Sequence, residues 1–193
     1  MSHPQSISLM KTSSNKTALF SFFPAPIKNT IPVLKMTLAD AYEYITGPTA
    51  VSRTRELRSK TDIKEARKFK SEKFDYCTFS GLFSKRSDQA LVQHSGLLFL
   101  DFDHLKNLEK VRQQLLNDDY FETQLLFVSP SGDGLKWIIE IDISQTTHAD
   151  YFRAVANYLK QTYNIDVDQS GKDVSRACFL PYDPDCYINP KNL

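Results

Sequence analysis

Cysteine is scarce in this sequence, and its pattern excludes two ways of stabilising a small domain. Only three cysteines occur among the 193 residues. An odd number without C-x-x-C spacing fits neither a disulfide framework nor a zinc site. The four histidines are scattered and also lack the spacing of metal ligands. We therefore expect reduced thiols in a cytoplasmic protein.

Long hydrophobic runs are missing as well. The longest uninterrupted apolar run, at residues 97–100, is far too short to cross a bilayer. The mostly apolar stretch at 18–23 is too short for the core of a signal peptide and leads directly into Pro24. The sequence therefore predicts no targeting segment and no membrane partner, with the cytoplasm as the expected location.

Net charge is nearly zero, with 24 Lys+Arg against 23 Asp+Glu, but the two signs are separated along the chain. Residues 1–88 carry 15 basic and 8 acidic side chains, a net of +7. Residues 89–193 carry 9 basic and 15 acidic side chains, a net of −6. This separation favours a polyanionic or metal–phosphate partner more strongly than the total of +1 does.

The composition, with 41% hydrophobic and 12% aromatic residues, indicates a folded protein. Residues 1–17 are polar and aperiodic, which predicts a disordered tail. Residues 18–95 are predicted to form an N-terminal extension of extended segments, basic helices and short strands packed on the core. In this extension Thr37 is expected to cap a helix that ends at Gly47.

Residues 96–193 are predicted to form the core. Apolar and alternating runs predict strands at 96–103, 123–128, 135–143 and 174–180. Apolar residues at helical spacing predict helices at about 105–117 and 147–163. The resulting order, β-α-β-β-α-β, is that of the ferredoxin-like or RRM-like fold, which belongs to the α+β class.

Two carboxylates, Asp101 and Asp103, fall on one face of the first core strand, opposite the row that packs under the helices. The usual strand order of this topology places Lys136 and Arg176 beside them, on a face that we expect to be open. Carboxylates two residues apart repel each other unless a cation holds them. The pattern therefore predicts a site for a divalent cation, Mg²⁺ or Mn²⁺, with room for phosphate.

A third carboxylate could come from the segment at 166–176, which contains Asp168 and Asp173. Either of them could complete the metal site, and Arg176 could pair with a phosphate. The alternative is an ordinary polar turn in which Arg176 forms a salt bridge with Asp173, and this segment alone favours that alternative.

The hairpin at 129–134 is a candidate loop for the phosphates of a nucleotide. Gly132 and Gly134 allow the backbone to approach a ligand closely, and the hydroxyls of Ser129 and Ser131 with free amides could hold an anion. Lys136 follows the loop and could reach a phosphate as a point charge. The same residues are also common in ordinary hairpins.

Nine basic residues and only four acidic ones occupy positions 53–73. Surface helices with solvated charges are the commoner meaning of such a run. The alternative is a contact surface for the phosphate backbone of a nucleic acid. The candidate contacts are Arg53, Arg55, Arg58, Lys60, Lys64, Arg67 and Lys68.

Three motifs together resemble the archaeo-eukaryotic primase (primase-polymerase) superfamily. They are Asp101-x-Asp103 after an apolar strand, the Ser-Gly-x-Gly turn at 131–134, and Asp173-x-x-Arg176. More narrowly, the runs KFDYCTFSGLFSKRSDQALVQHSGLLFLDFDHL, SPSGDGLK and DVSRACFLPYDPDCYIN resemble the VirE N-terminal family over about residues 30–190. That family is a primase-like domain of mobile elements that is often placed ahead of a helicase-type domain.

The resemblance implies metal-dependent primer synthesis or polymerisation from NTP or dNTP on a single-stranded template, with a separately encoded helicase as a partner. It implies that Asp101, Asp103 and Asp168 (or Asp173) hold the catalytic metal, and that the hairpin and Arg176 bind the nucleotide phosphates. Active members carry His at the position of Lys136. The alternative is therefore a module of the same fold that binds nucleic acid or nucleotide without catalysis.

Two further interpretations of the Asp-x-Asp strand are weaker. LLFLDFD also resembles the nucleophile strand of haloacid-dehalogenase-type phosphatases, but Leu105 stands where Thr or Val is expected. That fold also needs a helical crossover, and six residues between the second and third core strands leave no room for one. An EF-hand is excluded because Lys106 replaces the required Gly and Arg112 the bidentate Glu.

Overall fold

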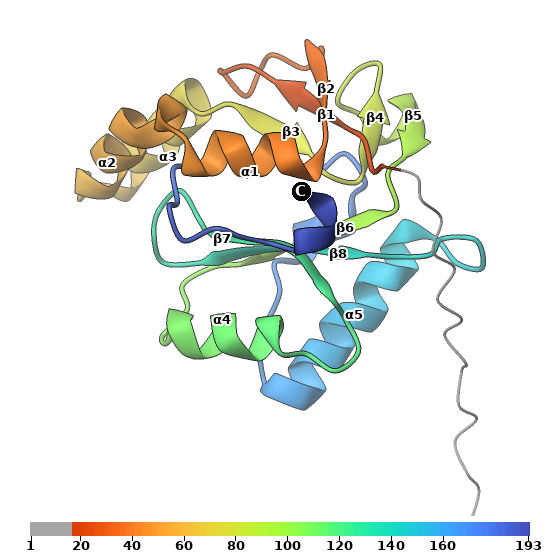
Figure 1. The fold of residues 1–193 in the computed structure, drawn as a ribbon. Coiled ribbons are helices and arrows are strands. Elements are labelled where there is room, and N and C mark those ends of the chain that lie inside the picture. Colours follow the sequence, from red (N-terminus) through yellow and green to blue (C-terminus); the bar gives the residue numbers. More distant parts are fainter. Residues whose placement is uncertain (1–16) are drawn as a thin grey trace, which may run out of the picture.

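Residues 17–193 are described by the computed structural model (Figure 1). Apart from Thr17, the predicted disordered tail lies outside the described residues. The helices and strands of the described part are, in chain order, β1 (Phe20–Phe23), β2 (Leu34–Met36), α1 (Leu38–Thr46), α2 (Val51–Ser59), α3 (Ile63–Lys73), β3 (Tyr76–Thr78), β4 (Gly81–Phe83), β5 (Leu91–His94), β6 (Leu97–Phe102), α4 (Leu108–Leu116), β7 (Thr123–Val128), β8 (Leu135–Glu140), α5 (His148–Tyr163), β9 (Cys178–Phe179) and β10 (Tyr187–Ile188).

The central sheet has the strand order β10-β7-β8-β6, and every neighbouring pair in it is antiparallel. Strands β6, β7 and β8 are the first three predicted core strands, with ends that differ by at most three residues from the predicted ones. The α+β class that the sequence predicts is therefore confirmed, with antiparallel sheets.

Helices α4 and α5 cover one face of the central sheet (Figure 1). The side chains of Asn107 and Thr147 cap these helices by accepting hydrogen bonds from backbone amides of the first turn. Leu98, Leu100 and Phe102 of β6 are fully buried in the cluster beneath the helices. The predicted core row of this strand is thus confirmed.

The opposite face of the central sheet is covered too. A second sheet, with the order β2-β1-β3-β9, and helix α1 pack against it (Figure 1). Phe99 of β6 is only 2% exposed and lies in a cluster with Phe20 and Phe79. The expectation of an open face is therefore wrong, because the short strands of the N-terminal segment bury the second apolar row of the sheet.

The last predicted core strand is also placed differently. Strand β9 has only two residues and pairs with β3 in the second sheet, where Tyr76 lies opposite Phe179. The preceding residues form a 3₁₀ helix, Gln169–Lys172, and turns, so they cannot form a ladder with β6. Strand β6 stays at the edge of its sheet, where the carbonyl of Asp101 accepts a hydrogen bond of 2.9 Å from the amide of Asp168.

The predicted extension and the predicted core share one hydrophobic cluster, and the boundary between them at residue 95 stays a prediction. Thr37 forms a capping box with Asp40 at the start of α1, which confirms the predicted cap. All three cysteines are buried and unpaired, as the sequence predicts. Among the helices of residues 17–193, none combines the length and apolar character needed to cross a membrane.

Candidate functional site

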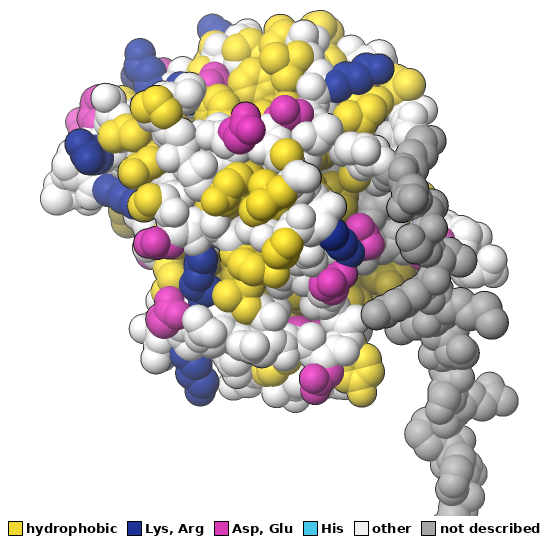
Figure 2. Space-filling model, viewed as in Figure 1, with side chains coloured by type: hydrophobic (Ala, Val, Ile, Leu, Met, Phe, Trp, Pro, Cys, Tyr) yellow, Lys and Arg dark blue, Asp and Glu magenta, His cyan; other side chains and the backbone are white. Residues whose placement is uncertain are grey.

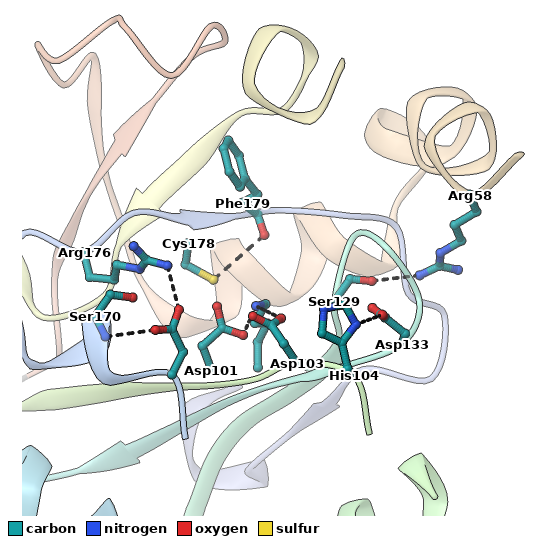
Figure 3. A network of polar contacts seen from close by, with 12 residues as sticks. Arg58, Asp101, Asp103, His104, Ser129, Asp133, Ser170, Arg176, Cys178 and Phe179 are labelled. Atoms are coloured by element: carbon teal, nitrogen blue, oxygen red, sulfur yellow. Dashed lines mark hydrogen bonds and ion pairs between the residues drawn. The ribbon is translucent and has the colours of Figure 1, made fainter. Parts of the chain in front are cut away.

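A cavity of about 360 Å³ lies between the two sheets, at the end of β6 where the strand leads into Asp103 (Figure 3). Its lining comes from both sheets and from α3. Acidic and basic side chains both contribute to it, among them Lys70, Arg86, Asp101, Asp103, Lys136 and Arg176. The cavity therefore presents both signs of charge to a ligand.

Three carboxylates converge beside this cavity. Asp101, Asp103 and Asp168 each offer an oxygen, and these oxygens all lie within 4.8 Å of one another. Asp101 is buried, whereas Asp103 is exposed and Asp168 is intermediate. The sequence left Asp168 and Asp173 as candidates for the third carboxylate. Asp168 belongs to the cluster, whereas Asp173 only lines the cavity nearby.

Lys136 is the closest cation to the cluster. It lies opposite Asp101 in the pairing of β6 with β8, and its ammonium donates a hydrogen bond to Asp101 and lies 3.7 Å from Asp103. Burial lowers the pKa of Lys136 to about 7, and the charges of Lys70 and Arg176 act in the same direction. The predicted neighbour of the Asp pair is confirmed, but its ammonium binds a carboxylate and does not point freely at a phosphate.

Arg176 holds the third carboxylate. Its guanidinium donates to Asp168 at 3.0 Å, and the amide of Ser170 donates to the same carboxylate at 2.9 Å (Figure 3). Burial raises the pKa of Asp168, but the hydrogen bonds from Ser170 and the charges of Arg176 and Lys136 outweigh it and hold this pKa below its usual value. With Asp173, Arg176 forms only a backbone hydrogen bond, which differs from the polar-turn alternative.

The hairpin between β7 and β8 has structural reasons for its glycines. A Cβ on Gly134 would lie 2.1 Å from the carbonyl oxygen of Phe102, and Gly132 has a φ of +88°. Arg58 holds the loop from outside by donating to the carbonyls of Ser129 and Pro130, each at 3.2 Å (Figure 3). These contacts account for the glycines without a ligand.

The remaining polar side chains of the hairpin differ in their surroundings. The hydroxyl of Ser129 is buried and has no hydrogen-bond partner in the described part of the chain, and Ser131 is exposed. His104, which follows the Asp-x-Asp motif, lies 2.6 Å from the carboxylate of Asp133. Of the loop residues, Pro130 lines the cavity. The predicted phosphate loop thus borders the cavity, and its role stays a prediction.

The seven predicted nucleic-acid contacts divide into two groups. Arg53 forms a salt bridge of 3.0 Å with Asp75 and also donates to Tyr44, and Arg58 holds the hairpin. Lys60 lies over the ring of Phe69. The other four are exposed on α2 and α3, as Arg58 also is, and these four are Arg55, Lys64, Arg67 and Lys68. Figure 2 shows Lys and Arg side chains at the left of the molecule, the side on which these helices lie in Figure 1.

Lys70 and Arg86 are cavity residues that the sequence did not single out. Lys70 belongs to the basic run of α3, but nothing in the run distinguishes it from its exposed neighbours. Arg86 lies between β4 and β5 and reaches the cavity only because this segment folds against the second sheet. No short-range pattern could have found either of them.

Fold and site together define an α+β domain with a cavity between two antiparallel sheets that carries a carboxylate cluster and several cations. The family model described as BT4734-like, N-terminal domain matches residues 68–188, which is more than half of the chain. The chain belongs to this family. A search of curated proteins and a search of solved structures found no match.

This family differs from the one that the motifs suggested. The expectation of a VirE N-terminal domain is wrong, because the model that matches is that of the BT4734-like N-terminal domain. Three sequence runs carried that resemblance, and the motifs within them consist largely of Asp, Gly and Ser, which recur in many polar turns. The roles that the resemblance implied now depend on the geometry of the cavity alone.

Proposed function

We propose that the domain binds a divalent cation and a nucleotide in this cavity and transfers the nucleotidyl group to a nucleic acid, as in primer synthesis or DNA polymerisation. One observation carries the proposal: Asp101, Asp103 and Asp168 converge within 4.8 Å beside a cavity that also holds basic side chains. Carboxylate oxygens are the ligands that Mg²⁺ and Mn²⁺ prefer, and cations suit phosphates.

The three carboxylates fit one divalent cation, but Asp101 also accepts a hydrogen bond from the ammonium of Lys136. Lys136 and Arg176 already offset part of the negative charge of the cluster. Burial lowers the pKa of Lys136, so its ammonium binds its proton less tightly than an ordinary lysine does, and a divalent cation would compete with it for Asp101. When bound, the cation would neutralise phosphate charge and orient the attacking and leaving oxygens.

The order of the core elements and the basic helices also support the proposed nucleotidyl transfer. The order of β6, α4, β7, β8 and α5 follows a ferredoxin-like core as far as α5, and we propose that this is the catalytic scaffold. The exposed basic residues of α2 and α3 offer a surface for a single-stranded template. The antiparallel pairing of β6, β7 and β8 argues against the haloacid-dehalogenase alternative, which needs a parallel sheet.

The direct test is primer extension and de novo synthesis with Mg²⁺ or Mn²⁺ and labelled nucleotides. We expect incorporation by the wild type and only background with Asp101→Asn/Asp103→Asn. Asp119→Asn is the matched control, because this exposed carboxylate lies outside the cluster. Wild-type incorporation that survives in the double variant would contradict the proposal.

A second function is favoured by one contact. Since the ammonium of Lys136 already binds Asp101, the domain could recognise nucleic acid or nucleotide without catalysing transfer. This module predicts no incorporation by the wild type, together with nucleic-acid binding that the double Asp variant retains.

The template surface has a separate test. Charge reversal by Arg55→Glu/Arg67→Glu should weaken binding of single-stranded DNA and reduce its dependence on salt. Lys106→Glu/Lys110→Glu makes the same charge change just before and within α4, which covers the other face of the central sheet, and should have much less effect. Equal losses in the two double variants would contradict a surface on α2 and α3.

A further inference from the structure

Two basic side chains of the cavity have no part in the proposed transfer: Lys70 of α3, and Arg86 between β4 and β5. Neither forms an ion pair with a carboxylate in residues 17–193. Uncompensated cations that line a concave site attract anions and raise their local concentration. The part of the cavity that Lys70 and Arg86 line is therefore suited to an anion.

Arg86 is held in place and still has a donor to spare. Its backbone amide donates to the carbonyl of Thr30 at 2.8 Å, and its guanidinium donates to the carbonyl of Ile27 at 3.3 Å. The guanidinium also lies 5.1 Å from the ring centroid of Tyr76. The Nε atom is buried and lacks a hydrogen-bond partner among the described residues. A fixed guanidinium with a free donor is preorganised for an oxyanion.

Arg176 and Lys70 complete the arrangement. The guanidinium of Arg176 binds Asp168 through one nitrogen, and its buried Nε has no partner in the described part of the chain. The ammonium of Lys70 lies 5.9 Å from the ring centroid of Phe179, which also lines the cavity. The charges of Lys70 and Arg176 both lower the pKa of Lys136, so they act across the same small space.

We infer that Lys70, Arg86 and Arg176 form a subsite for the phosphate chain of a nucleoside triphosphate, facing the carboxylate cluster. The inference rests on the proposed function and says where its substrate's phosphates lie. A volume of about 360 Å³ is in the range of small-molecule sites. Its place between two sheets suits the end of a nucleotide better than the continuous backbone of a nucleic acid.

The subsite shares Arg176 with the one that the sequence predicted, but Lys70 and Arg86 take the place of the hairpin. The carbonyls of Ser129 and Pro130 in the hairpin accept hydrogen bonds from Arg58, whereas Lys70, Arg86 and Arg176 all line the cavity. They come from distant parts of the sequence and meet only in the folded domain.

Calorimetric binding of inorganic tripolyphosphate in EDTA tests the subsite without any metal. Lys70→Met and Arg86→Met should each weaken binding at least about tenfold, because each removes a charged donor. Lys73→Met is the control, since it makes the same charge change on an exposed residue of the same helix and should alter affinity by less than about twofold. Asp103→Asn should bind at least as tightly as wild type, because a nearby negative charge is lost.

Equal affinities of wild type and Lys70→Met would overturn the inference, as would an equal loss in Lys73→Met. A competition experiment with single-stranded DNA tests the other ligand. If the DNA displaces tripolyphosphate, and if DNA binding is weakened by Lys70→Met but not by Lys73→Met, the cations bind a nucleic-acid backbone and the triphosphate assignment is overturned. Thermal unfolding is compared first because Arg86 packs on Tyr76, and Lys70→Met decides the test if Arg86→Met does not fold. A failure of nucleotide incorporation leaves this metal-free result unaffected, so the two proposals fail separately.

Discussion

The two faces of the central sheet are built from alternate residues of the same strands, yet they differ in charge. The face under α4 and α5 is apolar from Leu98 to Phe102. The face toward the second sheet is apolar as far as Phe99 and then carries Asp101 beside Lys136, which are only 6% and 7% exposed. The change occurs at the end of β6, where the two sheets enclose the cavity.

This difference indicates that the charged end is kept for a ligand rather than for stability. Moving two charges out of water has a desolvation cost that their attraction rarely exceeds, and an apolar pair of similar size is often as stable or more so. The apolar face shows that these strands can be filled with hydrophobic side chains throughout. Asp101 and Lys136 are therefore explained best by the cavity that they border.

The largest effect is expected from removing one partner of the charged pair. Asp101→Ala leaves the ammonium of Lys136 buried and should lower the free energy of unfolding by about 3–5 kcal/mol at pH 6. The folded-state pKa of Lys136 lies near 7, below that of an unfolded lysine, so the unfolded state binds more protons above pH 7. Once Lys136 is neutral in the folded state of both proteins, the variant no longer holds an unpaired buried ammonium. The deficit in the free energy of unfolding should therefore shrink as the pH rises from 7 to 9.

Urea unfolding of wild type and variant at pH 6 and pH 9 measures this. The control is Asp103→Ala, whose carboxylate is half exposed and lies farther from the ammonium, at 3.7 Å. A deficit that is the same at both pH values would show that the lost contact, and not the buried charge, determines the stability.

A smaller effect is expected on the apolar face, where the indole N–H of Trp137 donates to the hydroxyl of Thr123 at 2.7 Å. Thr123→Val keeps the shape but leaves that buried donor, and the carbonyl of Leu115, without a partner. The free energy of unfolding should fall by about 1–3 kcal/mol. Because no charge is involved, urea unfolding should give the same deficit at pH 6 and pH 9, and a pH-dependent deficit would contradict this account.

Sequence patterns predicted the face under the helices better than the face toward the second sheet. Six-residue strands such as β6 show two-residue alternation clearly, and apolar residues at helical spacing predicted the two helices that cover this face. The second sheet has strands of only two to four residues, which are too short to show a period. Its pairing of β3 with β9 joins segments about a hundred residues apart, and no local signal contains that information.

The difference between long and short strands also explains which residues of the candidate site could be predicted from the sequence. Asp101 and Lys136 were predicted as neighbours from the usual strand order of the fold, and the pairing of β6 with β8 places them opposite each other. Lys70 and Arg86 were missed because they reach the cavity from segments whose position is set by tertiary packing. In the hairpin, Gly134 was attributed to a ligand, although the backbone of Phe102 already excludes a side chain there.

A titratable pair joins β5 to the start of α5, and burial lowers the pKa of both of its histidines. His94 and His148 lie 3.0 Å apart, and burial together with the charge of His148 lowers the pKa of His94 to about 4. Below the usual histidine pKa of about 6.5 the unfolded state binds more protons, so stability should fall as the pH drops from 6.5 to 4. Because His94 is partly exposed, about 1–2 kcal/mol is expected after solvent screening.

Thermal and urea unfolding between pH 4 and pH 7 measures this loss, with His94→Gln as the comparison. Glutamine can still hydrogen-bond to His148 but does not titrate, so the variant should show a flatter dependence on pH. Parallel curves for the two proteins would assign the acid sensitivity to other groups.

The smallest effect concerns the loop beside the charged end of the sheet. Arg58→Met removes two hydrogen bonds to the carbonyls of Ser129 and Pro130, at a partly exposed site, and should change stability by less than about 1 kcal/mol. Amide exchange in residues 129–134 should become several times faster, whereas Arg55→Met, at another exposed arginine of the same helix, should leave it unchanged.

The pattern of results assigns Arg58 to one of two roles. Faster loop exchange with unchanged affinity for single-stranded DNA means that Arg58 holds the hairpin against the cavity. Unchanged exchange with weaker DNA binding means that it belongs to the nucleic-acid surface, as the sequence predicted. The first result is expected, because both of its guanidinium hydrogen bonds already go to the loop, and a phosphate would have to displace them.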